Sequence, residues 1–217
     1  SLLFGVAVGN IYAGIPMSAN GDYIGIPLLG LITPFTLLTG LLGLSMFLAQ
    51  GATWLALKSP KPSALRDRAV KAAFPIQIVA LALFVIVSIY GHFIIQPAMA
   101  PELTVLRFLF AAIVLVGIVG SMIMMRKGSD LWAFLCQSVG AFFLVALLAA
   151  SMFPNFVVAS PDSIGPSITL MSAAGSELAL MWMTIITCVG LPLVLIYHVI
   201  IYRTFRGRVK DEDLGHY

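Results

Sequence analysis

Five long apolar runs constrain the fold of this chain more than any other feature. Each run exceeds the roughly 20 residues that an α-helix needs to cross about 30 Å of hydrocarbon. Backbone polar groups in lipid must pair within their own segment, and a β-barrel would show shorter alternating segments. We therefore predict an all-α integral membrane protein with five full transmembrane helices, at Phe35–Leu57, Ala69–Ile95, Leu103–Met125, Leu131–Phe153 and Leu178–Tyr202.

The composition supports a membrane protein and argues against a soluble one. Of the 217 residues, 60% are apolar and 10% are charged, and the mean hydropathy is +1.05. A soluble domain carries roughly 25% charged residues, so this chain lacks the side chains to cover a water-exposed surface. The net charge is only +3, and the basic residues form short clusters between apolar runs. This pattern gives no support for a nucleic-acid partner.

The first segment, Ser1–Ile15, is apolar but stops at Pro16. As a helix it would reach roughly 22 Å, too short to cross the membrane. It also lacks the basic start of a signal peptide. We interpret it as the end of a helix whose beginning is missing. The chain is then one membrane domain (1–217): residues 1–16 end a truncated helix, 17–202 form a helical bundle with short loops, and 203–217 form a tail.

The basic residues predict the orientation. Eleven of the 12 Lys and Arg residues fall in the linkers after the first and third full spans or in the tail. Only Arg107 falls on the other side of the predicted topology. By the positive-inside rule the basic side, with the carboxy-terminal tail, is cytoplasmic.

Several polar residues and one proline within or beside the spans are candidate functional positions. Gln50 and Thr53 lie inside the first full span, where we expect hydrogen bonds between helices. Arg107 and Glu177 lie at similar depth at the non-cytoplasmic helix ends, where they either pair or reach water separately. A proton-transfer role is the less favoured alternative. Pro192, inside the last span, should bend that helix.

Two further positions have ordinary explanations in the sequence. Asp130 stands near the start of the fourth full span, where a carboxylate suits the helix dipole. Pro75 falls in the first turns of the second predicted span.

The two cysteines, Cys136 and Cys188, lie in apolar runs without a CxxC spacing, so we expect no disulfide framework.

The histidines are candidate haem ligands, because helix-borne histidines can ligate the haem iron. His92 lies near the non-cytoplasmic end of its span and His198 near the cytoplasmic end of the last one, so they do not form the two axial ligands of one haem. The preferred interpretation is a polar residue at the headgroup level or hydrogen-bonded in the bundle. The alternative is that either histidine ligates a haem alone or together with a methionine. His216, in the tail, should be solvated. We predict no catalytic, cofactor-binding or metal-binding residue, and no nucleotide-binding or hydrolase motif occurs.

An ordered series of short stretches resembles subunit II of the cytochrome bd quinol oxidases, in its carboxy-terminal half. The series runs through almost the whole chain in the family's order. It consists of Gly5–Asn10 (GVAVGN), Thr33–Gly40 (TPFTLLTG), Gln50–Leu55 (QGATWL), Met152–Asn155 (MFPN), Ser167–Leu170 (SITL), Leu178–Thr184 (LALMWMT), Pro192–Tyr197 (PLVLIY) and Tyr202–Val209 (YRTFRGRV). The family pattern has Asn where this chain has Thr33.

The resemblance implies an accessory, haem-free subunit of a quinol:oxygen oxidoreductase in the bacterial inner membrane. In such a complex the b- and d-type haems and the quinol site belong to subunit I, which this chain would stabilise. The implied partners are that haem-bearing subunit, the missing amino-terminal half of the same subunit, membrane lipids and a small accessory subunit. Quinone or lipid is a further candidate ligand in apolar grooves.

Two other functions remain open from the residues alone. A secondary transporter is supported by the proline within the last span and opposed by the uncharged centres of the spans. A scaffold subunit of some other membrane complex is compatible with the composition.

Overall fold

The computed structural model describes residues 1–95, 101–205 and 207, and five of its helices are long and apolar enough to cross a membrane. These helices confirm the five predicted spans, with ends that differ by at most five residues. The bounds are α2 Pro34–Lys58, α3 Ala64–Tyr90, α4 Thr104–Arg126, α5 Asp130–Met152 and α6 Glu177–Thr204. A π-helical turn, η2 (Gly91–Ile95), continues α3, and 3-10 turns lie at η1 (Leu29–Leu31) and η3 (Pro101–Leu103).

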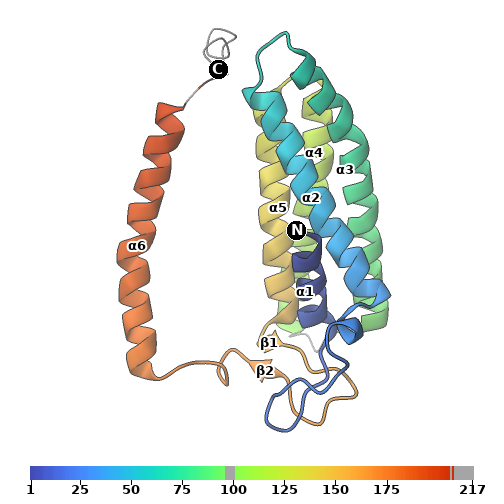
Figure 1. The fold of residues 1–217 in the computed structure, drawn as a ribbon, viewed down its shortest axis with the longest axis vertical. Helices are drawn as coiled ribbons and strands as arrows, with labels where there is room; N and C mark the ends of the chain where they lie inside the picture. Colours follow the sequence, from blue (N-terminus) through green and yellow to red (C-terminus); the bar gives the residue numbers. More distant parts are fainter. Residues whose placement is uncertain (96–100, 206, 208–217) are drawn as a thin grey trace.

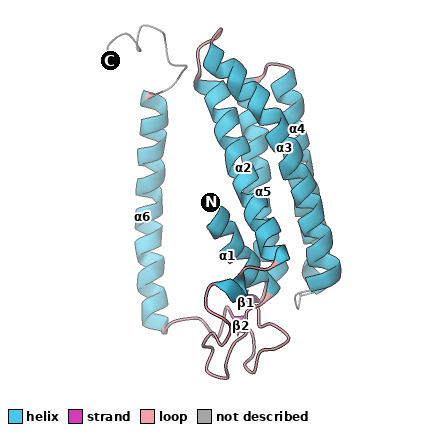
Figure 2. Cartoon of the chain, turned by 45° about the vertical axis from the view of Figure 1, so that its right-hand side comes forward, coloured by secondary structure: helices cyan, strands magenta, loops and turns pink. Residues whose placement is uncertain are grey.

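A shorter apolar helix, α1 (Leu2–Ala13), precedes the spans and packs against α2. The close approach depends on small residues, because a Cβ added at Gly5 would lie 2.8 Å from the Cα of Gly40. The Thr39 hydroxyl also donates to the Gly5 carbonyl across the two helices, at 3.1 Å. In Figure 2 the chain begins part of the way along the bundle. The expected helix at the start of the chain is therefore present, and it ends before Pro16.

Helices α2, α3, α4 and α5 form the packed bundle (Figure 1). One cluster of buried side chains joins α2, α3 and α4, and it comprises Leu42, Met46, Ala80, Phe84, Val114 and Ile118. Alanines dominate a second cluster, which comprises Ala52, Ala56, Ala69, Ala73, Met125 and Ala133. Small side chains let helix backbones approach closely, which is the usual packing mode in membranes.

Helix α6 stands apart from the bundle along most of its length (Figures 1 and 2). None of its residues is buried. Its last turn approaches α2, where the rings of Trp54 and Tyr202 have centroids 6.2 Å apart and Lys58 Nζ donates to the Phe205 carbonyl at 2.9 Å. Within this chain α2–α5 pack together, whereas α6 contacts the bundle only near its last turn. An apolar run shows that a helix suits lipid, but not which neighbour it packs against.

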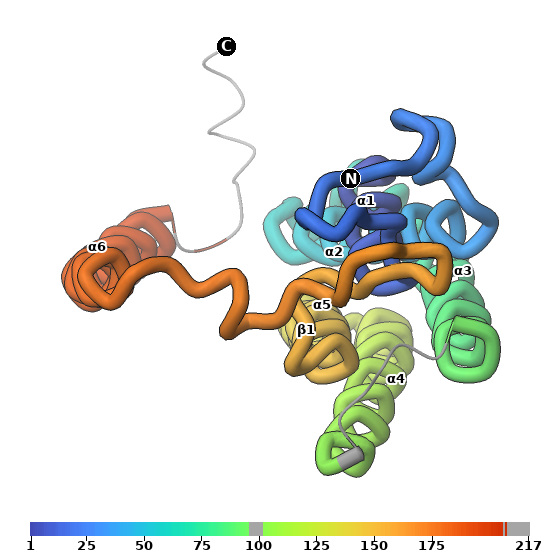
Figure 3. The backbone as a smooth tube through the Cα atoms, turned by 90° about the horizontal axis from the view of Figure 1, so that it is seen from below, coloured from blue at the N-terminus to red at the C-terminus, as the bar shows by residue number. Residues whose placement is uncertain are grey.

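The loops at one end of the bundle, residues 14–33 and 153–176, interlock and will be called the loop end (Figure 3). A small antiparallel pair, β1 (Asn155–Val157) and β2 (Ile168–Thr169), departs from the purely helical expectation. Met17 is only 1% exposed, and its carbonyl accepts from the Ile164 amide at 2.9 Å. The loops are short and ordered, as their Pro, Gly and Ser content predicts.

The opposite end of the bundle, called the basic end, contains the linkers at residues 59–63 and 127–129 and the end of α6 (Figure 1). Lys61 Nζ donates to the Gly128 carbonyl at 3.1 Å, so the two linkers meet. The basic clusters therefore gather at one end, as the alternating topology requires. Of the predicted tail, residue 206 and residues 208–217, with His216, lie outside the described residues.

The start of α3 corrects one prediction. Ser63 accepts a hydrogen bond from the Arg66 amide and so caps a helix that begins at Ala64, five residues before the predicted start. Pro75 consequently lies inside α3 rather than in its first turns. The first turns of α3 contain charged side chains, so the apolar run begins later than the helix does.

Candidate functional site

A cavity of about 180 Å³ lies between the five helices α1–α5 near the loop end. Its wall is mainly aliphatic and aromatic. Its polar members among the described residues are Thr39, Ser88, Ser151, Tyr12, His92 and Arg107, and these include no carboxylate. The geometry suits a largely apolar ligand that carries one polar group near Arg107.

Aromatic side chains support the mouth of the cavity. Tyr12 stacks on Phe35 with ring centroids 5.7 Å apart, and Phe35 contacts Tyr90 at 5.3 Å. On the other side the rings of His92 and Phe108 lie 6.2 Å apart. These contacts place α1, α2, α3 and α4 around one site, because each helix contributes at least one ring.

Arg107 has an unusual environment in the first turn of α4. One of its terminal nitrogens donates to the Thr104 hydroxyl at 3.0 Å. Its Nε is buried and has no hydrogen-bond partner among the described residues. Pairing with Glu177 was one of the two arrangements considered for Arg107; the ion pairs in the described part of the chain involve neither residue. Glu177 instead begins α6, away from the cavity.

A buried layer of amide and hydroxyl groups crosses the middle of the bundle. Gln77 of α3 donates to the Ser121 hydroxyl of α4 at 2.7 Å, and its Nε2 lies 3.4 Å from Oε1 of Gln137 in α5. Gln50 of α2 donates to the Ser138 hydroxyl at 2.7 Å. Polar side chains inside a membrane bundle commonly join helices in this way. Thr53, by contrast, donates to the Gln50 carbonyl of its own helix at 2.9 Å.

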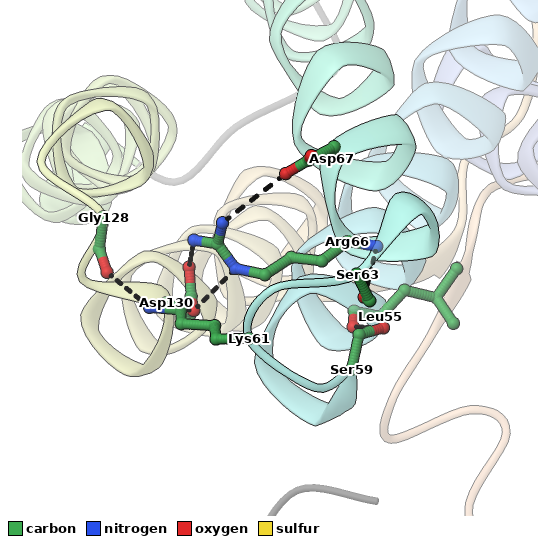
Figure 4. A network of polar contacts seen from close by, with 8 residues as sticks. All are labelled: Leu55, Ser59, Lys61, Ser63, Arg66, Asp67, Gly128 and Asp130. Carbon is green, nitrogen blue, oxygen red and sulfur yellow. Dashed lines mark hydrogen bonds and ion pairs between the residues drawn. The ribbon is translucent and has the colours of Figure 1, made fainter. Parts of the chain in front are cut away.

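A buried carboxylate joins the two linkers at the basic end (Figure 4). The Asp130 side chain is 1% exposed and accepts from Arg66 Nη2 at 2.8 Å and Nε at 3.3 Å. Lys61 Nζ lies 2.9 Å from Oδ2 of Asp130, the oxygen that also accepts from Arg66 Nε. Beyond the helix-capping role that we predicted for it, Asp130 therefore pairs with two cations, Lys61 of the 59–63 linker and Arg66 in the first turn of α3. Buried charges require such pairing.

The remaining sequence candidates lie on α6. The helix continues through Pro192. The His198 ring nitrogen Nδ1 lies 2.8 Å from the Val194 carbonyl, and His198 is exposed in the chain alone. His198 is 21 residues into α6, roughly 30 Å from its start at the loop end. It is therefore separated from His92, which lines the cavity at the loop end.

Common haem ligand pairs combine histidine with a second histidine or a methionine. Among the residues that the structure describes, the cavity wall contains His92 but no second histidine, methionine or cysteine, and Met99 lies outside the described residues. Among the described residues, no group of three His, Cys, Asp or Glu side chains could hold a metal ion.

Sequence reasoning did not assign roles to Tyr12 or to the Lys61–Arg66–Asp130 network. The aromatic stack depends on α1 reaching the loop end beside α2, which no local pattern encodes. One part of this network is visible in the sequence: Asp130 is the only carboxylate beside the basic linker that follows the third full span. In a membrane protein a lone acid between basic linkers is a candidate partner for them.

The fold and this site define a multi-pass helical membrane protein with an apolar cavity inside its bundle. The chain belongs to the cytochrome bd terminal oxidase subunit II family, whose sequence profile matches residues 1–205.

Two relatives illustrate the similarity. The chain is 28% identical over 242 residues to cytochrome bd-I ubiquinol oxidase subunit 2 of Escherichia coli strain K12, an alignment that covers 98% of this chain and 63% of the relative. It is 28% identical over 239 residues to the probable cytochrome oxidase subunit 2 of Haemophilus influenzae, which covers 96% and 62%. The chain thus spans somewhat less than two thirds of the length of these curated relatives.

Proposed function

We propose that this chain is a haem-free accessory subunit of a cytochrome bd-type quinol:oxygen oxidoreductase in the bacterial inner membrane. The family match over residues 1–205 carries the proposal. The haems of the enzyme, which pass electrons from quinol to oxygen when bound, would be held by the partner subunit. This chain would stabilise that subunit through its apolar helices, with the basic end and the carboxy-terminal tail in the cytoplasm.

The exposed helix α6 supports a role inside a larger assembly. Its large apolar side chains are exposed on every face, and its polar side chains bond only within the helix. A helix with exposed apolar faces beside a packed bundle is suited to pack against further helices. The alignment leaves more than a third of the length of the Escherichia coli relative uncovered, so that relative contains further chain that would be available to cover this face.

Purification of the tagged chain from its own membrane in mild detergent tests the proposal. We expect a haem-bearing polypeptide to copurify, and the preparation to consume oxygen with quinol as the donor. Solute uptake by vesicles that contain only this chain would favour the transporter alternative instead. No feature of the cavity favours that alternative, because Pro192 lies on α6, away from the cavity wall.

The histidines provide a sharper test of the haem-free assignment. In the purified complex, His92→Ala and His198→Ala should each leave the reduced-minus-oxidised haem spectrum unchanged. Loss of a b-type band in either variant, at equal subunit content, would place a haem on this chain and refute the assignment.

A further inference from the structure

We propose that the cavity between α1 and α5 is a binding site for one anionic membrane phospholipid, with its phosphate on Arg107 and an acyl chain among the apolar side chains. This site does not depend on the proposed oxidase role, because its occupancy is measured as bound lipid rather than as turnover.

The argument begins with the charge of Arg107. A guanidinium stays protonated in proteins, so this side chain keeps its positive charge at the edge of the membrane. Only the Thr104 hydroxyl bonds it, and its Nε is buried without a hydrogen-bond partner among the described residues. Arg107 as a whole is half-buried, and a charge that is partly withdrawn from water without a counter-ion is costly in a membrane, so an anion from elsewhere would stabilise this arrangement.

No carboxylate in the described part of the chain pairs with Arg107. Among the described residues no Asp or Glu lines the cavity, and Glu102, five residues before Arg107, makes no ion pair with it. The undescribed residues 96–100 read Gln-Pro-Ala-Met-Ala, so that neighbouring segment has no carboxylate side chain either. No described residue therefore serves as the counter-ion of Arg107, which leaves a place for an anion from another molecule.

The rest of the cavity selects the class of that molecule. Apart from the few polar groups at its wall, the lining is hydrocarbon and aromatic surface, including Leu42, Phe84, Leu144 and Leu148. A free inorganic anion gains nothing from such a lining, whereas an acyl chain is buried favourably in it. An oxygen-rich phosphate also matches the fork of nitrogens on arginine. An amphiphile with one anionic head meets both requirements, and the surrounding membrane supplies phospholipids of this kind.

The test measures lipid binding to the complex that the tagged chain forms in its own membrane. The complex is purified in mild detergent, depleted of exchangeable lipid, and titrated with phosphatidylglycerol while native mass spectrometry counts bound molecules. Arg107→Gln should weaken the tightest phosphatidylglycerol site about tenfold, the effect expected for loss of a charge-assisted hydrogen bond. Arg107→Lys should retain most of the affinity because it keeps the charge.

Matched variants separate the site from general attraction to basic surfaces. Arg68→Gln removes an exposed arginine near the basic end and should leave the tightest site unchanged. Ala111→Leu narrows the cavity while Arg107 remains, and should also weaken binding. This second variant keeps the test decisive if Arg107→Gln does not assemble.

Four results would each overturn the proposal. The first is unchanged phosphatidylglycerol affinity in both Arg107→Gln and Ala111→Leu. The second is equal binding of zwitterionic phosphatidylcholine. The third is occupancy by inorganic phosphate alone, which would identify a free-anion site. The fourth is displacement of phosphatidylglycerol by decylubiquinone to the same extent in the wild type and in Arg107→Gln, which would identify a quinone site.

Discussion

The bundle α2–α5 and the lone helix α6 have similar apolar composition but opposite surroundings. The bundle helices bury glutamines and serines against one another, as in the Gln77–Ser121 hydrogen bond. The polar side chains of α6 turn back onto their own backbone, as Thr187 does toward the Met183 carbonyl at 2.7 Å. Hydropathy therefore predicts that a helix lies in the membrane. The direction of its polar side chains distinguishes a helix packed against others from one without helix neighbours in this chain.

Glycines show the same difference. A Cβ at Gly117 in α4 would lie 2.8 Å from the Cα of Gly140 in α5, so the two backbones touch there. A Cβ at Gly190 in α6 would meet nothing within 4 Å. Equivalent changes in the two regions should consequently have unequal effects on the unfolding of the chain.

The largest expected effect is at the basic end. Asp130→Asn removes the charge that neutralises Lys61 and Arg66, and should lower the free energy of unfolding by about 3 kcal/mol, since broken buried ion pairs cost this much. Unfolding in mixed detergent and sodium dodecyl sulfate, followed by circular dichroism, would measure it. Glu177→Gln, at the exposed start of α6, is the control and should have a much smaller effect. Equal effects would contradict the contrast between the regions.

The paired glycines should give the next largest effect. Gly117→Ala forces two backbones apart and should destabilise the chain by about 2 kcal/mol, within the range for overpacking. Gly190→Ala should be neutral or stabilise α6 by up to about 1 kcal/mol, because alanine favours helix where nothing clashes. The same unfolding assay would compare them. A second control within the bundle is Gly140→Ala, whose new Cβ would lie 3.6 Å from its nearest neighbours and should be tolerated better than Gly117→Ala.

Polar substitutions should show a smaller difference. Gln77→Leu leaves Ser121 and Gln137 without this partner and should cost about 1 kcal/mol, typical of hydrogen bonds between membrane helices. Thr187→Val removes only a bond within α6 and should change unfolding by less than half as much. If Thr187→Val proved the more damaging substitution, α6 would have partners that its bonds in this chain do not reveal.

The smallest effect on the isolated chain should come from the surface of α6. Ile186 is 66% exposed, so Ile186→Ala should change unfolding by less than about 0.5 kcal/mol. In the full complex the same variant should release the copurifying partner at a lower detergent concentration if that partner covers α6. A partner retained equally by Ile186→Ala and by a multiple-alanine variant of the same face would show that α6 is not the contact.

Much of the helical framework could be predicted from the sequence, because hydrocarbon thickness sets a length that the apolar runs display directly. The start of α3 was missed because its first turns contain Arg66, Asp67 and Arg68, although the cap at Ser63 was visible. Arg107 was identified as a candidate, but its cavity was not, since the wall comes from five helices distant in sequence. Pairing of Asp130 depends on which linkers meet, which periodicity does not encode.

The interlocked loops have a consequence for biosynthesis. Met17 donates its amide to the Ser163 hydroxyl at 3.0 Å, across 146 residues of chain. Contacts of such sequence separation form late, because the intervening chain must first be ordered. The segment around Met17 therefore emerges from the ribosome long before its partner Ser163. It lacks this contact while the four helices α2–α5 are inserted. A nascent chain halted before residue 163 should leave this segment open to protease, and release of the arrest should close it.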